Sequence, residues 1–133
     1  MPISALEKLQ VWLSNYPHWD AYPANICILP KAMEETSRRV DVMGNTLVGC
    51  RYYVTLFWEI AEQCDQAEKA CRLLDFQNWV QEQVTLGLAP KFGDMPTRES
   101  IRTEKGGLTA GTQITTYTVT LVADFMKVYE VKE

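Results

Sequence analysis

The stretch from Thr46 to Glu59 constrains the fold more than any other part of this chain. Its residues alternate between two sets, and one set is apolar throughout: Val48, Cys50, Tyr52, Val54, Leu56 and Trp58. Successive side chains of a β-strand point to opposite faces, so this pattern predicts one long strand with a buried face and a mixed face. Its β-branched and aromatic content favours the same structure. A sheet with one apolar face needs a second layer to cover it.

The segment that follows, up to Gly87, is predicted to be helical and to supply that layer. It holds two apolar stripes at helical spacing: Ala67, Ala70, Cys71 and Leu74, then Phe76, Trp79, Val80 and Val84. At about 100° per residue the stripes do not coincide. Either one helix is apolar over a wide arc or it breaks, and we expect a kink or break near Leu74 with Asp75 as a cap. Gly87 should end the helix, and Pro90 should prevent it from resuming.

An amphipathic helix is also predicted near the N-terminus. Ser4-Ala5-Leu6-Glu7 matches the capping box S-x-x-E, which predicts a helix start at Ser4. An apolar stripe continues from there: Leu6, Leu9, Trp12, Leu13 and Tyr16. Pro17 should stop the helix. A helix that binds a partner would carry the same stripe, but packing on the sheet is the simpler interpretation.

Two β-hairpins are predicted around these helices. The first begins with a short strand, Asn25 to Leu29, closed by Pro30, which suits a sheet edge. A polar loop, Lys31 to Glu35, then leads to a polar arm from Thr36 to Val42. Met43-Gly44-Asn45 has the chemistry of a turn into the long strand. The polar arm and the turn should be exposed to solvent or meet a partner.

The second hairpin is predicted at the C-terminal end. Arg98 to Glu104 is expected to be a short strand, and Lys105 to Gln113 a loop with three glycines. Their spacing fits neither G-x-x-x-x-G-K-[ST] nor G-x-G-x-x-G, which argues against a nucleotide site. Thr115 to Val131 is a clear strand, whose buried face should hold Tyr117, Val119, Leu121, Ala123 and Phe125.

These elements predict an α+β fold. We expect one domain over residues 1–133, a two-layer sandwich with a mainly antiparallel sheet and two helical regions on one face. The chain has 47% apolar and 23% charged residues, and no run approaches a membrane span. No signal peptide is expected at the N-terminus, which predicts a cytosolic protein. The net charge of −4, with scattered basic residues, does not favour phosphate binding.

Few residues suggest a catalytic or metal-binding site. The four cysteines lack a C-x-x-C pair, so we expect reduced, structural thiols, with Cys64 and Cys71 turned inward, and no metal or cofactor. The single histidine, His18, lies near Asp20 in a loop bounded by prolines. With a cysteine these are the only reactive set that an enzyme or ligand-binding domain would use, and no motif links them.

Three segments together resemble a known family. They are Asp75-Phe76-Gln77-Asn78-Trp79-Val80-Gln81-Glu82-Gln83 followed by Gly87 and Pro90, the hairpin strand Arg51 to Phe57, and the strand Tyr117 to Phe125 after a glycine-rich loop. In this order they are similar to the minor capsid or tail-completion proteins of siphophages and prophages, which are in turn similar to tail terminators. The resemblance covers the chain from about residue 36 onward.

This resemblance implies a structural role without catalytic residues or cofactors. Such proteins are α+β and form rings, usually hexameric, at the head-proximal end of the tail tube. The ring stops polymerisation of the tail-tube protein and meets the head-completion or connector protein, while DNA only passes through. We therefore expect the protein in the host bacterial cytoplasm during assembly and later in the virion tail or neck, with no membrane partner.

Interface residues can be nominated by their place in the predicted elements. They are Arg38, Arg39, Asp41 and Arg51 on the first hairpin, and Lys105, Gly106, Gly107 and Gly111 in the glycine loop. A charged edge that discourages aggregation is the alternative reading of the hairpin charges. For the whole protein, the alternatives are a head-completion or stopper protein, a small enzyme or ligand-binding domain, and an adaptor that binds other proteins.

Overall fold

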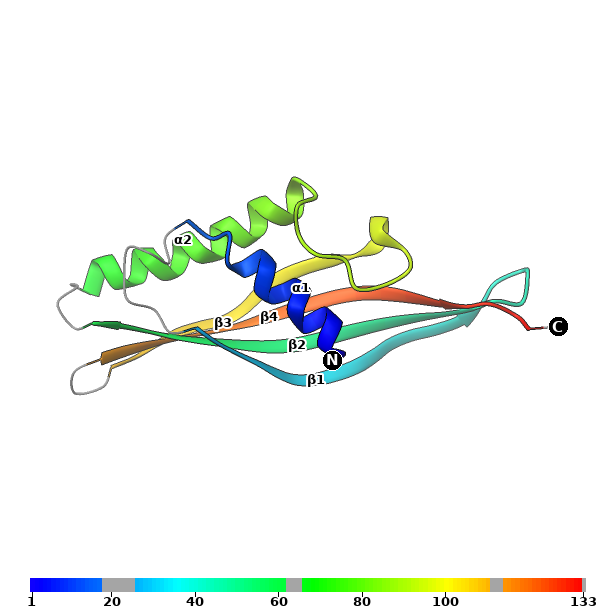
Figure 1. Cartoon of the computed structure of the whole chain (residues 1–133), viewed down its shortest axis with the longest axis horizontal. Coiled ribbons are helices and arrows are strands. Elements are labelled where there is room, and N and C mark those ends of the chain that lie inside the picture. The colour runs from blue at the N-terminus through cyan, green and yellow to red at the C-terminus, as the bar shows by residue number, and fades with distance from the viewer. Residues whose placement is uncertain (18–25, 62–65, 111–113, 133) are drawn as a thin grey trace.

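The computed structural model describes residues 1–17, 26–61, 66–110 and 114–132. Its elements are α1 (Ile3–Leu13), β1 (Cys27–Val40), β2 (Thr46–Ala61), α2 (Gln66–Thr85), the 3-10 turn η2 (Pro96–Arg98), β3 (Ser100–Ala110) and β4 (Ile114–Tyr129). In these ranges four strands form one sheet, ordered β1-β2-β4-β3, and neighbouring strands are antiparallel. Both helices lie on one face of the sheet (Figure 1). The predicted α+β fold, a sheet with two helices on one face, is confirmed.

Strand β2 lies inside the sheet and carries the predicted buried face. All six residues of its apolar set are buried, and Leu56 is completely so. β4 pairs with β2 over its whole length, from Tyr129 opposite Thr46 to Ile114 opposite Ala61. The predicted apolar face of β4 is buried as well. These two strands form the floor of the core on which the helices pack.

Helix α2 corrects the prediction of a break. It runs without interruption through Leu74 and Asp75. Its buried residues recur at helical spacing and form one face: Lys69, Leu73, Phe76, Trp79 and Val80. The stripe of Ala67, Ala70, Cys71 and Leu74 is exposed instead. Small residues such as Ala are compatible with a solvent-facing helix surface, so their apolar count overstated the width of the buried face.

The end of α2 follows the prediction. Gly87 has a φ of 73°, a left-handed conformation that glycine adopts without steric cost. Its N–H donates to the carbonyl of Val84, and the N–H of Leu88 donates to the carbonyl of Gln83. This pair of bonds is the Schellman motif, which satisfies two of the last helical carbonyls.

Helix α1 buries the expected stripe but does not begin as expected. Leu9, Trp12 and Leu13 are buried. The helix starts at Ile3, and the carbonyl of Pro2 accepts hydrogen bonds from the N–H groups of Ala5 and Leu6. The predicted capping box is therefore wrong, because Ser4 already lies inside the first turn.

Aromatic side chains join the two helices. Trp12 of α1 stacks on Trp79 of α2 with ring centroids 5.1 Å apart, and the Trp12 indole N–H donates to Gln83 at 3.1 Å. Tyr16 meets Phe76 edge-on at 5.3 Å, and its hydroxyl donates to the Asp75 carboxylate at 2.5 Å. Asp75 thus connects α2 to the segment that follows α1, which replaces its predicted role as a cap.

The strands are longer than predicted. β1 continues through Pro30 and through Lys31 to Glu35, which were expected to be a loop. Its register shifts on either side of that segment, between Pro30 and Ala32 and between Glu35 and Ser37. A proline is tolerated there because β1 is an edge strand, whose outer side needs no donor to a neighbouring strand.

The glycine segment is also partly strand. β3 includes Lys105, Gly106 and Gly107, and a register shift between Glu104 and Gly107 absorbs the extra residues. The prediction of a loop is therefore wrong for Lys105 to Ala110. Gly111 and Gln113 lie outside the described residues, as do His18, Asp20 and Cys64. The first hairpin, its turn and the antiparallel pairing of β3 with β4 are confirmed.

The loop between α2 and β3 is fixed to β4. The Asp94 N–H donates to the Met126 carbonyl at 2.7 Å, and the Asp94 carboxylate accepts from the Val128 N–H at 2.8 Å. The Glu99 carboxylate accepts from the N–H of Gly93. Gly93 lies so close to β4 that a Cβ there would overlap the Met126 carbonyl oxygen.

This contact predicts the effect of Gly93→Ala. The added methyl meets backbone atoms that cannot rotate away, so the free energy of unfolding should fall by about 1–3 kcal/mol. Gly107→Ala is the matched control, because a Cβ at Gly107 meets nothing within 4 Å. Urea denaturation compares the two variants. Equal stabilities would contradict the close approach.

A second prediction concerns pH. Burial, and then the hydrogen bond to Asp75, raise the pKa of Tyr16 well above its ordinary value. In the unfolded chain Tyr16 loses its proton near pH 10, whereas the folded chain keeps it. The contribution of Tyr16 to the free energy of unfolding is therefore fully present below pH 10 and decreases as the pH rises further.

Tyr16→Phe removes this titration along with the hydrogen bond. Its free energy of unfolding should be about 1–2 kcal/mol lower at pH 7 and should fall less steeply than that of the wild type from pH 9 to pH 11. Denaturation at a series of pH values measures both quantities. Tyr129→Phe, at an exposed position, is the control and should follow the wild type. Parallel pH curves for Tyr16→Phe and wild type would refute the assignment.

Candidate functional site

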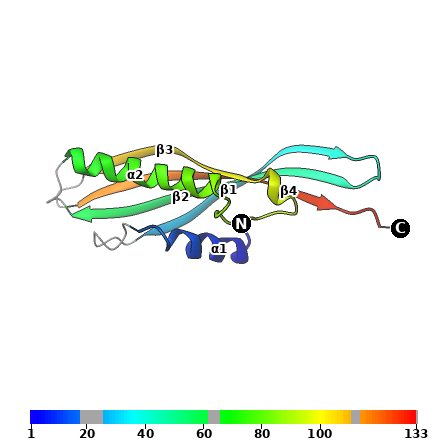
Figure 2. The same cartoon turned by 90° about the horizontal axis from the view of Figure 1, so that it is seen from above.

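Part of the sheet extends beyond both helices. The turn between β1 and β2 and the end of β4 project past the helical layer in both views (Figures 1 and 2). We call this part, residues 36–49 and 126–131, the distal arm. Its three strands are in register, with Val40 opposite Thr46 and Thr46 opposite Tyr129.

The distal arm ends in exposed apolar side chains. We call them the apolar tip: Val40, Val42, Met43, Tyr129 and Val131. Val42 is fully exposed, and Met43 is 79% exposed. Single exposed apolar residues are ordinary on protein surfaces, but a group on one projecting end is typical of a surface that contacts another protein.

The turn that carries the apolar tip is well ordered by hydrogen bonds. The Asp41 carboxylate accepts from the N–H groups of Met43 and Asn45, each at 2.9 Å. Gly44 adopts a φ of 86°, and the Asn45 amide oxygen accepts from the N–H of Val131 at 3.1 Å. The predicted interface residue Asp41 therefore shapes the turn, and it is the neighbouring apolar side chains that face outward.

The other predicted residues of the first hairpin lie on different faces. Arg38 lies on the helix-bearing side of the distal arm and pairs with Glu35 at 2.6 Å. Arg39 is exposed on the opposite side. The hydrogen bond to Glu35 raises the pKa of Arg38. These two arginines therefore do not form one site.

Arg51 belongs to a row of charges on the open face, the sheet face opposite the helices. Its guanidinium contacts the Asp124 carboxylate of β4 at 2.6 Å. Arg102 of β3 reaches the same carboxylate at 2.9 Å. On the other side, Glu34 of β1 lies opposite Arg51 in the register and accepts from the Tyr53 hydroxyl at 2.8 Å. The charge row, Arg102–Asp124–Arg51–Glu34, therefore alternates in sign across all four strands.

The environment of the charge row strengthens its central pair. Arg51 and Asp124 side chains are 28% and 27% exposed, so water screens them only in part. Hydrogen bonds, first to Asp124 and then to Tyr53, raise the pKa of Arg51. Val122, completely buried on the same face, lies in register between Tyr53 and Arg102. Long side chains of this kind cover apolar surface with their stems.

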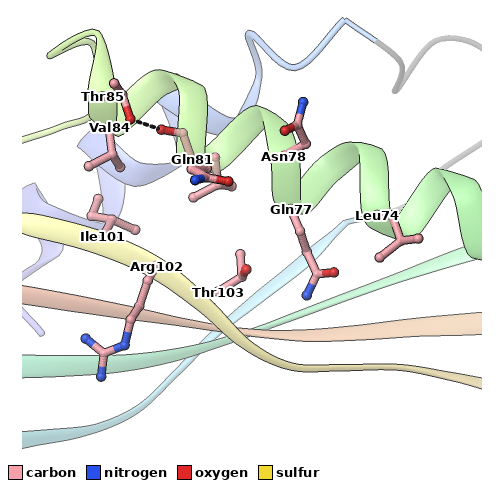
Figure 3. A pocket seen from close by; sticks show the side chains of 10 residues that line it. Leu74, Gln77, Asn78, Gln81, Val84, Thr85, Ile101, Arg102 and Thr103 are labelled. Carbon is pink, nitrogen blue, oxygen red and sulfur yellow. Dashed lines mark hydrogen bonds between the residues drawn. The ribbon is translucent and has the colours of Figure 1, made fainter.

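A groove of about 600 Å³ runs between α2 and the edge strand β3 (Figure 3). Its lining is partly apolar and partly amide: Leu74, Val80, Val84, Ile101, Gln77, Asn78 and Gln81, with Thr85, Arg102 and Thr103. In Figure 3 the Arg102 side chain points away from α2, which agrees with its place on the open face. Gly106 allows β3 to approach α2 closely, because a Cβ at this position would meet the Gln77 side-chain amide.

Sequence reasoning found Arg51 but missed its partners. Asp124 and Glu34 lie 73 and 17 positions from Arg51 in the sequence, and only strand register places them beside it. The groove was missed although its β3 residues, Ile101 to Thr103, lie in a predicted strand, because the position of α2 beside β3 depends on tertiary contacts. Cys71 is exposed, so the expected inward thiol is wrong there; Cys27 is exposed and Cys50 is buried.

Within the described ranges, no group of three or more His, Cys, Asp and Glu side chains is placed to hold a metal ion. In the same ranges no helix is long and apolar enough to cross a membrane. No protein-family model, no curated protein and no solved structure matches this chain.

The charge row predicts that Asp124 is its most important member. Asp124→Ala leaves two guanidinium groups close together on a partly buried surface, so the free energy of unfolding should fall by about 1–2 kcal/mol. Glu104→Ala is the control, since the ion pair of Glu104 with Arg102 is exposed to solvent and its loss should change stability by less than about 0.5 kcal/mol.

Urea denaturation at low and high salt checks this prediction. The loss in Asp124→Ala should be smaller in 1 M NaCl, because salt screens the charges that it disturbs. A variant as stable as the wild type at low salt would mean that the row contributes nothing measurable.

Proposed function

We propose that this protein is a non-enzymatic structural component of the phage head–tail junction, a tail terminator. In this role its copies form a ring, hexameric as in similar proteins, on the head-proximal end of the tail tube. The ring caps the tube, ends polymerisation of the tail-tube protein and presents a surface to the head-completion or connector protein. DNA passes through the ring without being bound.

The observation that carries this proposal is the apolar tip on the distal arm. Val42 and Met43 are held outward by a turn whose conformation is fixed by Asp41 and Gly44. A rigid, projecting apolar surface loses little conformational entropy on docking, so it suits a lasting contact with another protein. The acidic net charge of −4 also suits a ring through which DNA slides.

The proposed location follows from the proposed role. The protein would be made in the host bacterial cytoplasm and would end in the tail or neck of the virion. The resemblance in the segments Arg51 to Phe57, Asp75 to Gln83 and Tyr117 to Phe125 supports this assignment.

The test is a tube-capping assay. Purified protein is added to polymerising tail-tube protein, and tube lengths are measured by electron microscopy. Wild-type protein should shorten the tubes and label one end. Val42→Asp and Met43→Asp should each need about tenfold more protein for the same effect, because a charge then replaces an apolar contact. Binding to the connector with no effect on tubes would instead assign a stopper.

A matched control separates docking from folding. Leu86→Asp places the same charge on another exposed apolar residue, 69% exposed, at the end of α2. It should cap as the wild type does, and all three variants should unfold at the wild-type denaturant midpoint within error. Wild-type protein that neither caps nor shortens tubes rules out the terminator role.

A further inference from the structure

We propose that copies of this chain join head to tail through their two sheet edges. In this arrangement β1 of one copy pairs with β3 of the next, and Glu34 of the first faces Arg102 of the second. The inference rests on the ring in the proposed function and names the two surfaces that build it. Three features of the described residues support it: the free edges, the charge row and the groove.

The sheet has two different outer edges, formed by β1 and by β3. In the order β1-β2-β4-β3, both outer strands pair on one side only within the described chain. β1 is exposed almost throughout its 14 residues. An outer strand offers a row of backbone N–H and C=O groups to any strand that can lie beside it. Each copy therefore has two different edges, β1 and β3, at which a neighbouring copy can pair.

The charge row favours unlike edges. It begins at β3 with Arg102 and ends at β1 with Glu34, so its two ends have opposite sign. A head-to-tail neighbour continues the alternation, because its Glu34 comes beside Arg102. Pairing of two β1 edges would bring two Glu34 carboxylates together, and pairing of two β3 edges would bring two Arg102 groups together. Like charges across an interface repel, which selects the unlike pairing.

The direction of the strands sets the register. β1 and β3 are antiparallel within one chain, since three antiparallel pairs separate them. A neighbour with the same strand direction therefore places its β1 antiparallel to β3. With its Glu34 opposite Arg102, its Met33 lies opposite Thr103. Thr103 lines the groove under α2, so the neighbour's Met33 enters that groove.

The chemistry of that contact is complementary. Met33 is 55% exposed and lies on the helix-bearing face, opposite Tyr52 in the register. The groove offers it the apolar side chains of Val80, Val84 and Ile101, and an unbranched Met side chain fits irregular apolar spaces. The amide groups of Gln77 and Gln81 lie along the same groove, where they can bond polar groups of the added strand.

The irregular positions of both strands limit this pairing to one place. Register shifts bracket the regular segment of β1 between Ala32 and Glu35. The regular segment of β3 runs from Ser100 to Glu104, before its own shift. The paired residues, Glu34 and Arg102, lie within these two segments. Bulges elsewhere discourage pairing with other strands.

A head-to-tail contact of this kind is the type of interface from which rings are built. An interface between two different surfaces of the same chain is heterologous, and it generates a ring when the rotation between neighbours closes. The sheets then form one continuous antiparallel layer, and the helices of all copies lie on the same side of it.

Complementary charge reversals test the contact. Glu34→Arg gives a chain with two basic edges, and Arg102→Glu gives a chain with two acidic edges. Each alone should assemble at a concentration about tenfold or more above that of the wild type. Mixed in equal amounts, the two should assemble near the wild-type concentration, because each interface then joins opposite charges. Light scattering and sedimentation measure the assembled fraction.

Controls exclude a general effect of charge. Glu7→Arg on α1 and Arg98→Glu in η2 carry the same changes at exposed positions away from the charge row and should assemble as the wild type does. Arg102→Glu also disturbs Asp124, so denaturation must show that it is folded at the assay temperature. If it is not, the cysteine pair below decides the question alone.

A disulfide tests the register directly. In a chain whose Cys27, Cys50, Cys64 and Cys71 are replaced by Ser or Ala, Met33→Cys and Thr103→Cys are combined. These positions lie on opposite edges of one sheet, too far apart to bond within a copy, but directly opposite in the proposed pairing. Mild oxidation with oxidised glutathione should give covalent oligomers up to the ring, seen on a non-reducing denaturing gel.

Each result decides the inference. Dimers from Met33→Cys alone or Thr103→Cys alone would indicate like-edge pairing and overturn it, as would a mixture that fails to restore assembly or a wild type that remains monomeric. The tube-capping assay with the apolar-tip variants is a separate measurement. Rings that form through other surfaces and still cap tubes would refute the edge pairing while leaving the terminator role in place.

Discussion

The pairing of β2 with β4 and the burial of their shared apolar face under the helices support everything else in this molecule. The two strands are in register over sixteen residue pairs, and Leu56, Tyr117 and Val119 in this face are completely buried. Burying one large apolar side chain contributes about 1.5–3 kcal/mol, whereas an exposed ion pair contributes at most about 1 kcal/mol. The apolar layer therefore decides the fold, and the charges on the opposite face can be used for other purposes.

The helices cover only part of the length of the sheet. Aromatic contacts fasten α1 to α2, and Phe76 packs on Trp58 of β2 with ring centroids 5.2 Å apart. Beyond the helices the loop after α2 covers Tyr52 through Phe92, and past that point the sheet continues as the distal arm. Strand pairing, the turn at Asp41 and the hydrogen bonds of Asp94 to Met126 and Val128 maintain this arm without a helical layer. Its position explains why apolar side chains can remain exposed at its end without exposing the core.

The open face and the edges are organised differently from the core. Ion pairs cross the sheet from β3 through β4 to β2, and a hydrogen bond from the Tyr53 hydroxyl continues to Glu34 of β1, so the two edges of the sheet end in charges of opposite sign. The distal arm and the two edges are separate surfaces. In the proposed assembly, the edges join like copies and the distal arm meets unlike proteins, so growth of the ring and capping of the tube need not compete for the same residues.

The sequence by itself determined the local features whose signals are periodic. The alternation from Val48 to Trp58 predicted β2 and its faces, the alternation from Tyr117 to Phe125 predicted β4, and Gly87 predicted the end of α2. These succeeded because a side chain's direction in a strand, and a glycine's freedom at positive φ, depend on the chain alone. The exposure of the first hairpin arm could be read in the same way from its polar residues.

Only the tertiary structure decided the rest. β1 reads as a loop at Lys31 to Glu35, yet pairing with β2 makes it a strand, since the partner supplies hydrogen bonds that local propensity does not measure. α2 stays continuous because a single face, which includes Lys69, meets the sheet, and no local signal distinguishes that face from the exposed alanines. Arg51, Asp124, Arg102 and Glu34 become a row only through strand order and register, which depend on contacts between residues far apart in the sequence.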